Sequence, residues 1–229
     1  MSQQSVFEKK YVENDKMNDV EGVLEHFNLP PQFISFIRKH VRIIQISIAV
    51  IVVLVIAVVM FKTYQEKKVR DSSNALSLAI EESGENKINA LNSVVSDYSG
   101  TDAALWATVE LGHQYMKDQK FSKAQLEYSK VANDTAVEHP AHPLVLFGQG
   151  QAYEALGNYD DAKIIYQGLK DIEGYRDIAF LGIARSYEAK EEFEAAIAIY
   201  NEYLLTREGA SPQVKKYIEG KIARLQRQK

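Results

Sequence analysis

Two histidines with the spacing of metal ligands stand in one short segment of the chain. His139 and His142 are three residues apart, and Asp134 and Glu138 lie close to them in the sequence. Imidazole nitrogens and carboxylate oxygens bind metals, so this set could hold a cation if further ligands converged on it. A proline follows each histidine, however, and prolines end one helix and open the next. We therefore interpret the segment as an exposed loop between helices and expect no metal there.

The rest of the sequence holds no recognisable catalytic motif. The 229 residues contain no cysteine, no G-x-S-x-G elbow, no Walker phosphate loop and no H-E-x-x-H zinc motif. Lys and Arg number 27 against 31 Asp and Glu, and this acidic excess argues against nucleic acid, which requires a basic surface. We expect a protein that is not an enzyme and needs no cofactor.

One uncharged apolar run separates a tail from a longer C-terminal part. Residues 43–61 read IIQISIAVIVVLVIAVVMF, and Gln45 and Ser47 are the only polar members of these 19 residues. A helix of this length measures about 28 Å, close to the hydrocarbon thickness of a bilayer. The run starts after 42 residues and lacks a small-residue cleavage site, unlike a signal peptide. It predicts a single uncleaved transmembrane anchor.

The tail, residues 1–42, contains patterns typical of two short helices. Asp19 can cap the first, and Pro31 can open the second, which has apolar residues on one side and Arg38 and Lys39 on the other. The second resembles an amphipathic helix at a membrane interface, and a poorly ordered basic tail is the alternative. Lys and Arg are almost evenly divided between the two sides of the anchor, so the positive-inside rule does not decide its orientation.

A four-residue pattern recurs three times after the anchor. A small residue is followed by tyrosine three residues later, alanine nine further on and a second tyrosine four beyond that. The sets are Gly112, Tyr115, Ala124 and Tyr128; Gly150, Tyr153, Ala162 and Tyr166; Ala184, Tyr187, Ala196 and Tyr200. We expect each copy to be a helical hairpin in which the small residue allows a close helix crossing and the first tyrosine fills the space beside it. Such a hairpin must stack on its neighbours to bury its apolar face.

The sequence also predicts the limits of the hairpins. Turns are expected at 118–120, 156–158 and 190–192, each followed by an aromatic residue. Residues 62–104 contain a linker helix and a degenerate hairpin, broken at 83–86, that lacks the pattern. Ser211 and Pro212 can open a last helix, within 211–229, whose apolar stripe is surrounded by basic residues. This is typical of the helix that caps a repeat array.

The three copies, over residues 105–210, resemble tetratricopeptide repeats. The family's tryptophan at position four and its proline at position 32 are absent. The resemblance implies an all-α fold: one transmembrane helix, then an α-solenoid of about three clear repeats with a degenerate N-terminal hairpin and a C-terminal capping helix. The lysine, asparagine and arginine set with which some members hold a chaperone's C-terminal carboxylate is missing.

In this family, positions 2, 5, 9 and 12 of each first helix line the concave face. The matching residues here are Trp106, Val109, His113 and Met116; Leu144, Phe147, Gln151 and Glu154; Ile178, Leu181, Arg185 and Glu188. Positions 2 and 5 are apolar in all three copies, which predicts a strip for an apolar segment of a partner protein. Burial of these side chains in the core, or under another helix or subunit, is the alternative.

The order of tail, anchor and repeats resembles the ancillary subunit of the bacterial Sec translocon. This resemblance implies a single-pass inner-membrane protein with a cytoplasmic tail and a periplasmic repeat domain. It also implies a chaperone-like scaffold that binds translocon subunits and periplasmic chaperones. Two alternatives remain open. One is a self-assembling, homo-oligomeric scaffold of the envelope, in division or secretion machinery, and the other is a cytosol-facing adaptor with the reverse orientation.

Overall fold

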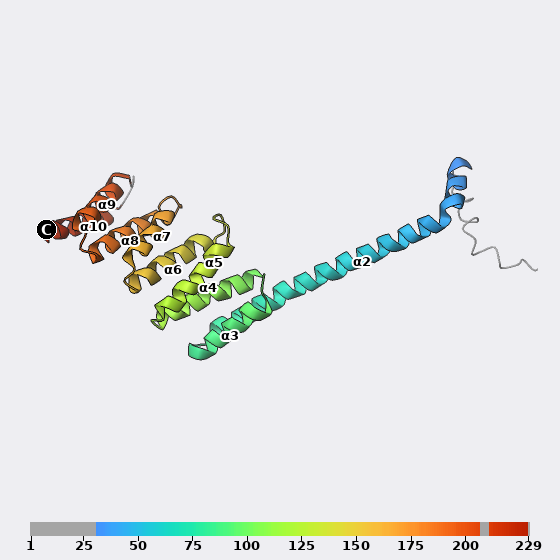
Figure 1. Cartoon of the computed structure of the whole chain (residues 1–229), viewed down its shortest axis with the longest axis horizontal. Helices are drawn as coiled ribbons and strands as arrows, with labels where there is room; N and C mark the ends of the chain where they lie inside the picture. The colour runs from blue at the N-terminus through green and yellow to red at the C-terminus, as the bar shows by residue number, and fades with distance from the viewer. Residues whose placement is uncertain (1–30, 207–210, 229) are drawn as a thin grey trace, which may run out of the picture. The chain divides into compact units, whose positions relative to one another are not determined.

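The computed structural model describes residues 31–206 and 211–228, and the chain divides into two compact units, Met1–Tyr64 and Gln65–Lys229. The helix that we expect after Asp19 lies outside the described residues. Within the described ranges the regular structure is helical throughout, so the all-α class predicted from the sequence is confirmed. Figure 1 shows the helices with the labels used below.

The first unit contains the apolar run as part of one long helix. Helix α2 (Pro31–Glu81) opens at the proline expected to start it, and its backbone departs from helical geometry only at His40, where φ is −118° and ψ is 18°. The large aliphatic side chains of the run are exposed, for example Val53 at 64% and Ile51 at 59%. In water this exposure would be unfavourable, because each such side chain gains about 1.5–3 kcal/mol on leaving water. By length and composition α2 is a candidate membrane span.

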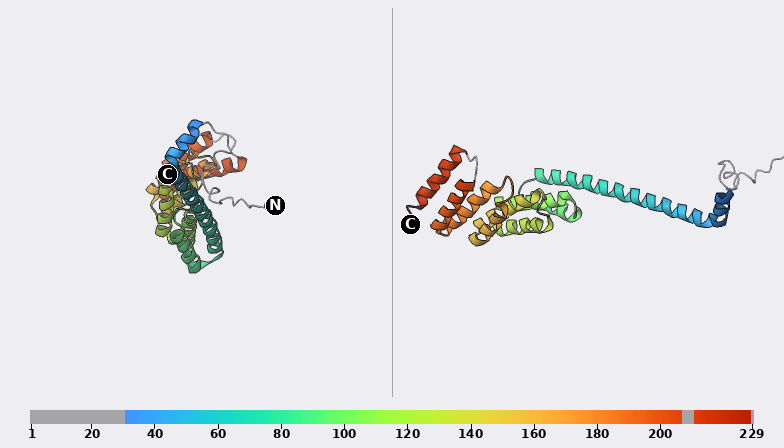
Figure 2. Two further views of the ribbon diagram at one scale, coloured as in Figure 1. Left: turned by 90° about the vertical axis from the view of Figure 1, so that its right-hand side faces the viewer. Right: turned by 90° about the horizontal axis from the view of Figure 1, so that it is seen from above.

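The second unit is a row of helical hairpins, shown from two sides in Figure 2. The end of α2 pairs with α3 (Gly84–Asp97), α4 (Asp102–Lys117) with α5 (Phe121–Asp134), α6 (Ala141–Ala155) with α7 (Tyr159–Leu169), and α8 (Arg176–Ala189) with α9 (Phe193–Thr206). Helix α10 (Pro212–Leu225) closes the row by packing on α9. From α3 to α10 each helix packs on the next in the chain, and α6 contacts both α4 and α8. The first helices of the three repeats therefore form one continuous layer.

The three predicted turns inside the hairpins are confirmed. Each separates two helices by three residues, and the middle residue has a positive φ: 59° at Gln119, 77° at Gly157 and 60° at Glu191. A left-handed residue directly after a helix stops its hydrogen-bond ladder and reverses the chain. Two other limits differ from the prediction. Helix α3 already begins at Gly84, so the break in the first hairpin is confined to residues 82 and 83, and His142 lies within α6 rather than in a loop.

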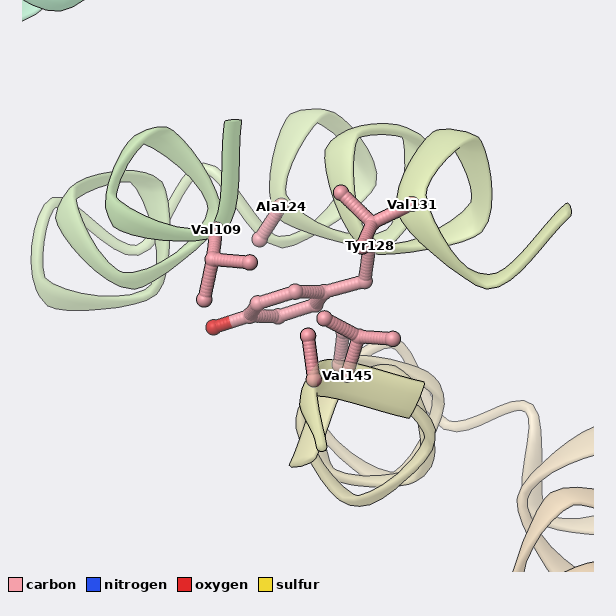
Figure 3. Packing of buried hydrophobic residues seen from close by; sticks show 7 residues of the cluster. Val109, Ala124, Tyr128, Val131 and Val145 are labelled. Atoms are coloured by element: carbon pink, nitrogen blue, oxygen red, sulfur yellow. The ribbon is translucent and has the colours of Figure 1, made fainter. Parts of the chain in front are cut away.

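In the first two sets the second tyrosine lies against the glycines at the close helix crossings. A Cβ atom added to Gly112 or Gly148 would lie 2.5 or 2.7 Å from the ring of Tyr128, and one added to Gly150 or Gly182 would lie 2.6 Å from the ring of Tyr166. Figure 3 shows Tyr128 within its cluster, with Val109 and Val145 on neighbouring helices. The first tyrosine lies on the same helix as the glycine, whereas the second reaches across from the facing helix. The first tyrosines Tyr115, Tyr153 and Tyr187 pack against the core clusters, so the second tyrosine adds a contact that the pattern did not predict.

The start of α10 confirms its predicted cap. The Ser211 hydroxyl accepts a hydrogen bond of 3.3 Å from the Val214 N–H, and a proline occupies the first turn. Ile218 and Leu225 are buried, while Tyr217 remains 55% exposed. The helix thus buries only part of its apolar stripe.

Candidate functional site

One open hollow on the second unit is lined by residues of all three repeats and of α10. Its volume is about 710 Å³, and five of the twelve residues proposed for the concave face line it. The lining residues are Met116, Gln151, Glu154, Ala155, Tyr159, Arg185, Glu188, Ala189 and Lys221. The folded chain therefore brings together residues from positions 9 and 12 of the predicted face.

The apolar residues proposed at positions 2 and 5 lie elsewhere. Val109 is 0% exposed and belongs to the core cluster around Tyr128, against which Trp106 and Leu144 also pack. Phe147 packs against the cluster around Tyr166 and Leu181 against the cluster around Tyr200, and Ile178 is half-buried. None of these six side chains lines the hollow. Of the six, only Val109 is fully buried, and the other five are half-buried.

His113, at position 9 of the first repeat, is exposed but also lies outside the lining of the hollow. Its ring stands 5.7 Å from the ring of Tyr128 at an interplanar angle of 61°. Its Nδ1 is 3.5 Å from a carboxylate oxygen of Glu110. His113 therefore lies beside the Tyr128 ring and Glu110 rather than in the hollow.

Glu154 is the centre of a polar cluster on the floor of the hollow. The Tyr166 hydroxyl donates to its Oε2 at 2.9 Å, and Arg185 donates through Nε to Oε1 at 3.2 Å and through Nη2 to Oε2 at 3.0 Å. The Glu154 side chain is 18% exposed and that of Arg185 is 43% exposed. The carboxylate is thus covered, while the guanidinium reaches solvent.

Glu188 repeats this arrangement one repeat later. The Tyr200 hydroxyl and Arg224 Nη2 donate to its carboxylate, and Lys221 Nζ donates to both oxygens at 3.2 and 3.3 Å. The side chain of Glu188 is 13% exposed, whereas that of Arg224 is 51% exposed. Because Lys221 and Arg224 belong to α10, this cluster joins the capping helix to the last repeat.

Both clusters affect the titration of the tyrosines that they contain. Burial, and then the neighbouring Glu154 carboxylate, raise the pKa of Tyr166 well above its usual value. Burial, and then the hydrogen bond to Glu188, raise the pKa of Tyr200 in the same direction. Both phenols are therefore neutral donors over the physiological pH range.

Sequence reasoning placed Glu154 and Glu188 on the concave face but missed their partners. The sequence does contain a sign of the tyrosine–glutamate pairs, because glutamate at position 12 and the second tyrosine occur together in the second and third repeats. In the first repeat Met116 replaces the glutamate, and Tyr128 lacks this carboxylate partner. The contact of Lys221 with Glu188 is not predictable from the sequence, because it depends on how α10 packs.

The histidine pair has local roles in the structure. The His139 Nδ1 atom accepts the Ala141 N–H at 3.1 Å, next to the start of α6. The His142 Nδ1 atom lies 3.1 Å from the Thr135 hydroxyl. Across residues 31–206 and 211–228 there is no group of three or more side chains suited to holding a metal ion.

Comparison with known proteins supports the repeat assignment. Residues 144–172 match a family described as Tetratricopeptide repeat. The repeat array is a tetratricopeptide-type solenoid. A crystal structure described as the nearly identical TPR-like repeats of a kinesin light chain from Podosopora anserina has a TM-score of 0.50 and 18% identity, over 72% of this chain and 85% of that one. A single-substitution variant of it gives the same score and identity, over 72% and 84%. No curated protein matches the chain.

Tetratricopeptide solenoids as a class act as protein-binding modules, and this is the coarse function that the fold supports. The hollow has the chemistry for such a role. It combines apolar lining, from Met116, Ala155 and Ala189, with the exposed amide of Gln151 and the exposed guanidinium of Arg185. A surface of this composition can hold an extended peptide through side-chain hydrogen bonds as well as apolar contact.

Proposed function

We propose that this chain is a membrane-tethered, non-enzymatic scaffold that binds segments of partner proteins in the hollow formed by its tetratricopeptide repeats. The observation that carries the proposal is the continuity of that hollow across three repeats and α10. Tethering would raise the local concentration of partners beside the membrane without any additional contact. The contact surface consists of positions 9 and 12 of the repeats rather than the apolar strip.

Site-specific photocrosslinking tests this surface. A photoreactive residue at Gln151, which is exposed and lines the hollow, should form adducts with partner proteins in cells. The matched control is Leu126, which is 53% exposed on α5 and lies outside the hollow. Adducts that form at Leu126 but not at Gln151 would contradict the proposal, and mass spectrometry of the adducts identifies the partners.

The layout of tail, anchor and repeats supports a finer proposal. The chain would lie in the bacterial inner membrane with a periplasmic repeat domain, and would hold chaperones or clients beside the Sec translocon. Adducts from Gln151 that contain translocon subunits or periplasmic chaperones are the expected result. Adducts that contain only other copies of this chain would instead favour the self-assembling envelope scaffold.

Protease accessibility tests the orientation. If the repeats are periplasmic, protease added after the outer membrane alone is opened should digest residues 62–229. Protection until the inner membrane is breached would contradict the translocon proposal and favour the cytosol-facing adaptor. The binding surface itself would be unaffected by that outcome.

A further inference from the structure

On the polar side of the hollow, the arginines are more exposed to solvent than the carboxylates with which they pair. Glu154 and Glu188, the two acidic residues that line it, are 18% and 13% exposed and are each bonded by a tyrosine hydroxyl and by cations. Their cationic partners Arg185 and Arg224 are 43% and 51% exposed. A molecule approaching from solvent therefore meets guanidinium groups before it meets carboxylates.

The two guanidinium groups keep unused hydrogen-bond donors. Arg185 uses Nε and Nη2 toward Glu154, and Arg224 uses Nη2 toward Glu188. These bonds, and the contact of Arg185 with Tyr166, engage only part of the donors of each group. A guanidinium has five N–H donors in a rigid fork, so each group can bind a further carboxylate while it keeps its internal partner.

The internal bonds also hold the donors in place. Arg185 is fixed by two bonds to Glu154, and its guanidinium lies 6.0 Å from the centre of the Tyr166 ring. Lys221, which lines the hollow, is the third cation of the group, whereas Arg224 lies outside the lining and joins the group through its bond to Glu188. With three cations against two covered carboxylates, the group carries one excess positive charge, although the chain as a whole carries −4.

We propose that the hollow selects an acidic peptide segment of a partner protein, whose Asp or Glu side chains pair with Arg185 in the hollow and with Arg224 beside it. Apolar residues of the same segment would contact Met116, Ala155 and Ala189, which line the hollow beside the charges. Pre-ordered donors lower the entropic cost of binding, and opposite charge speeds encounter and disfavours basic segments. This inference rests on the proposed function and specifies the chemistry of the partner.

Fluorescence anisotropy on the full chain in detergent micelles tests the selection. The probe is a short labelled peptide in which glutamate and leucine alternate, and the comparison peptides replace glutamate with glutamine or lysine. The glutamate peptide should bind, the other two should bind at least about tenfold more weakly, and added salt should reduce the difference. Equal binding of the three peptides would overturn the proposal.

Two substitutions locate the site. Arg185→Gln and Arg224→Gln should each weaken the glutamate peptide by about tenfold, the loss expected for one charge-assisted bond. Arg176→Gln is the matched control, because Arg176 is an exposed arginine of α8 that neither lines the hollow nor bonds to a carboxylate that lines it. Circular dichroism verifies that each variant is folded, and Arg185→Lys keeps the charge without the fork if Arg185→Gln does not fold.

The outcomes separate this inference from the proposed function. If the Arg185→Gln variant keeps its adducts from Gln151 in cells and binds the glutamate peptide as the parent chain does, the acidic selection is wrong and the scaffold function stands. If a photoreactive residue at Gln151 forms no adducts at all, both the scaffold function and the acidic selection are wrong. Binding that requires two copies of the chain, seen by sedimentation, would assign the surface to self-assembly instead.

Discussion

At the scale of single residues, tyrosine rings pack directly against glycines of neighbouring helices and so join successive repeats. Tyr128 and Tyr166 each lie between two glycines on successive inner helices. A ring seated in this way contacts backbone on two sides, and dense packing of this kind tolerates little added volume. The glycines thus have a steric role rather than a conformational one.

Replacing Gly150 with alanine should destabilise the array by about 1–3 kcal/mol, because the new Cβ would lie 2.6 Å from the Tyr166 ring. Leucine at this position should prevent folding. Urea unfolding followed by circular dichroism measures the change. Gly168→Ala in α7 is the matched control, since nothing lies within 4 Å of its Cβ position, and it should stabilise by about 0.5–1 kcal/mol. Equal effects of the two substitutions would contradict the steric role.

Alkaline pH should unfold the array through its buried tyrosines. Burial is the main cause that raises the pKa values of Tyr128, Tyr166 and Tyr200 above the usual value. A phenol whose pKa is higher in the folded state stabilises the fold fully below the unfolded pKa of about 10, and this contribution is lost as the pH rises above that value. Tyrosinate absorbance and circular dichroism should therefore show late ionisation steps that coincide with loss of helix. Complete ionisation with unchanged helicity would contradict this expectation.

At the scale of helices, the end of the solenoid depends on a polar cluster. Helix α10 buries Ile218 and Leu225 but leaves part of its apolar stripe exposed. The bonds from Lys221 and Arg224 to Glu188 add a second attachment, to α8. Charge-assisted bonds to a covered carboxylate contribute more than bonds at a fully exposed surface.

Glu188→Gln should loosen α10, because Lys221 and Arg224 would lose their counter-charge. We expect α10 to open more readily by about 1–3 kcal/mol, measured by native-state hydrogen exchange of its amides, while α4 to α6 stay protected. The matched control is Glu127→Gln. Its side chain is also 13% exposed, but it pairs with Lys130 on the same helix, so exchange in α10 should not change. Exchange that rises equally in all helices would show a global effect instead.

At the scale of the whole molecule, an apolar run and a repeat array are joined in one chain. The run of residues 43–61 exposes its large aliphatic side chains, whereas the second unit buries many of its own in four clusters. This contrast in exposure agrees with α2 as a candidate membrane span, which its length and composition indicate.

Val53→Arg combined with Ile56→Arg should release the chain from membranes. Each arginine at the centre of a span costs about 2.5–3.5 kcal/mol, which together offsets much of the apolar gain of the run. Alkaline extraction of membranes followed by immunoblotting measures the effect. Val69→Arg with Ser73→Arg is the control, because both residues are exposed on α2 beyond the run. If the first variant stays in the membrane fraction, residues 43–61 are not the anchor.

Much of the architecture was predictable because local physics decides it. The hairpin turns follow from helix-stopping positions, the start of α10 from Ser211 and Pro212, and the candidate span from composition alone. The repeat period predicted the stacking of hairpins, because an amphipathic hairpin cannot bury its apolar face by itself. Each of these features depends on residues that are close together in the sequence.

The tertiary structure alone decided which side chains are available to a partner. Val109 occupies a predicted concave position, yet neighbouring repeats bury it completely. Glu154 and Glu188 occupy equally predictable positions, yet Arg185 and α10 cover them and present cations in their place. Periodicity identifies the face of a helix, whereas the exposure and charge of that face depend on what distant residues place over it.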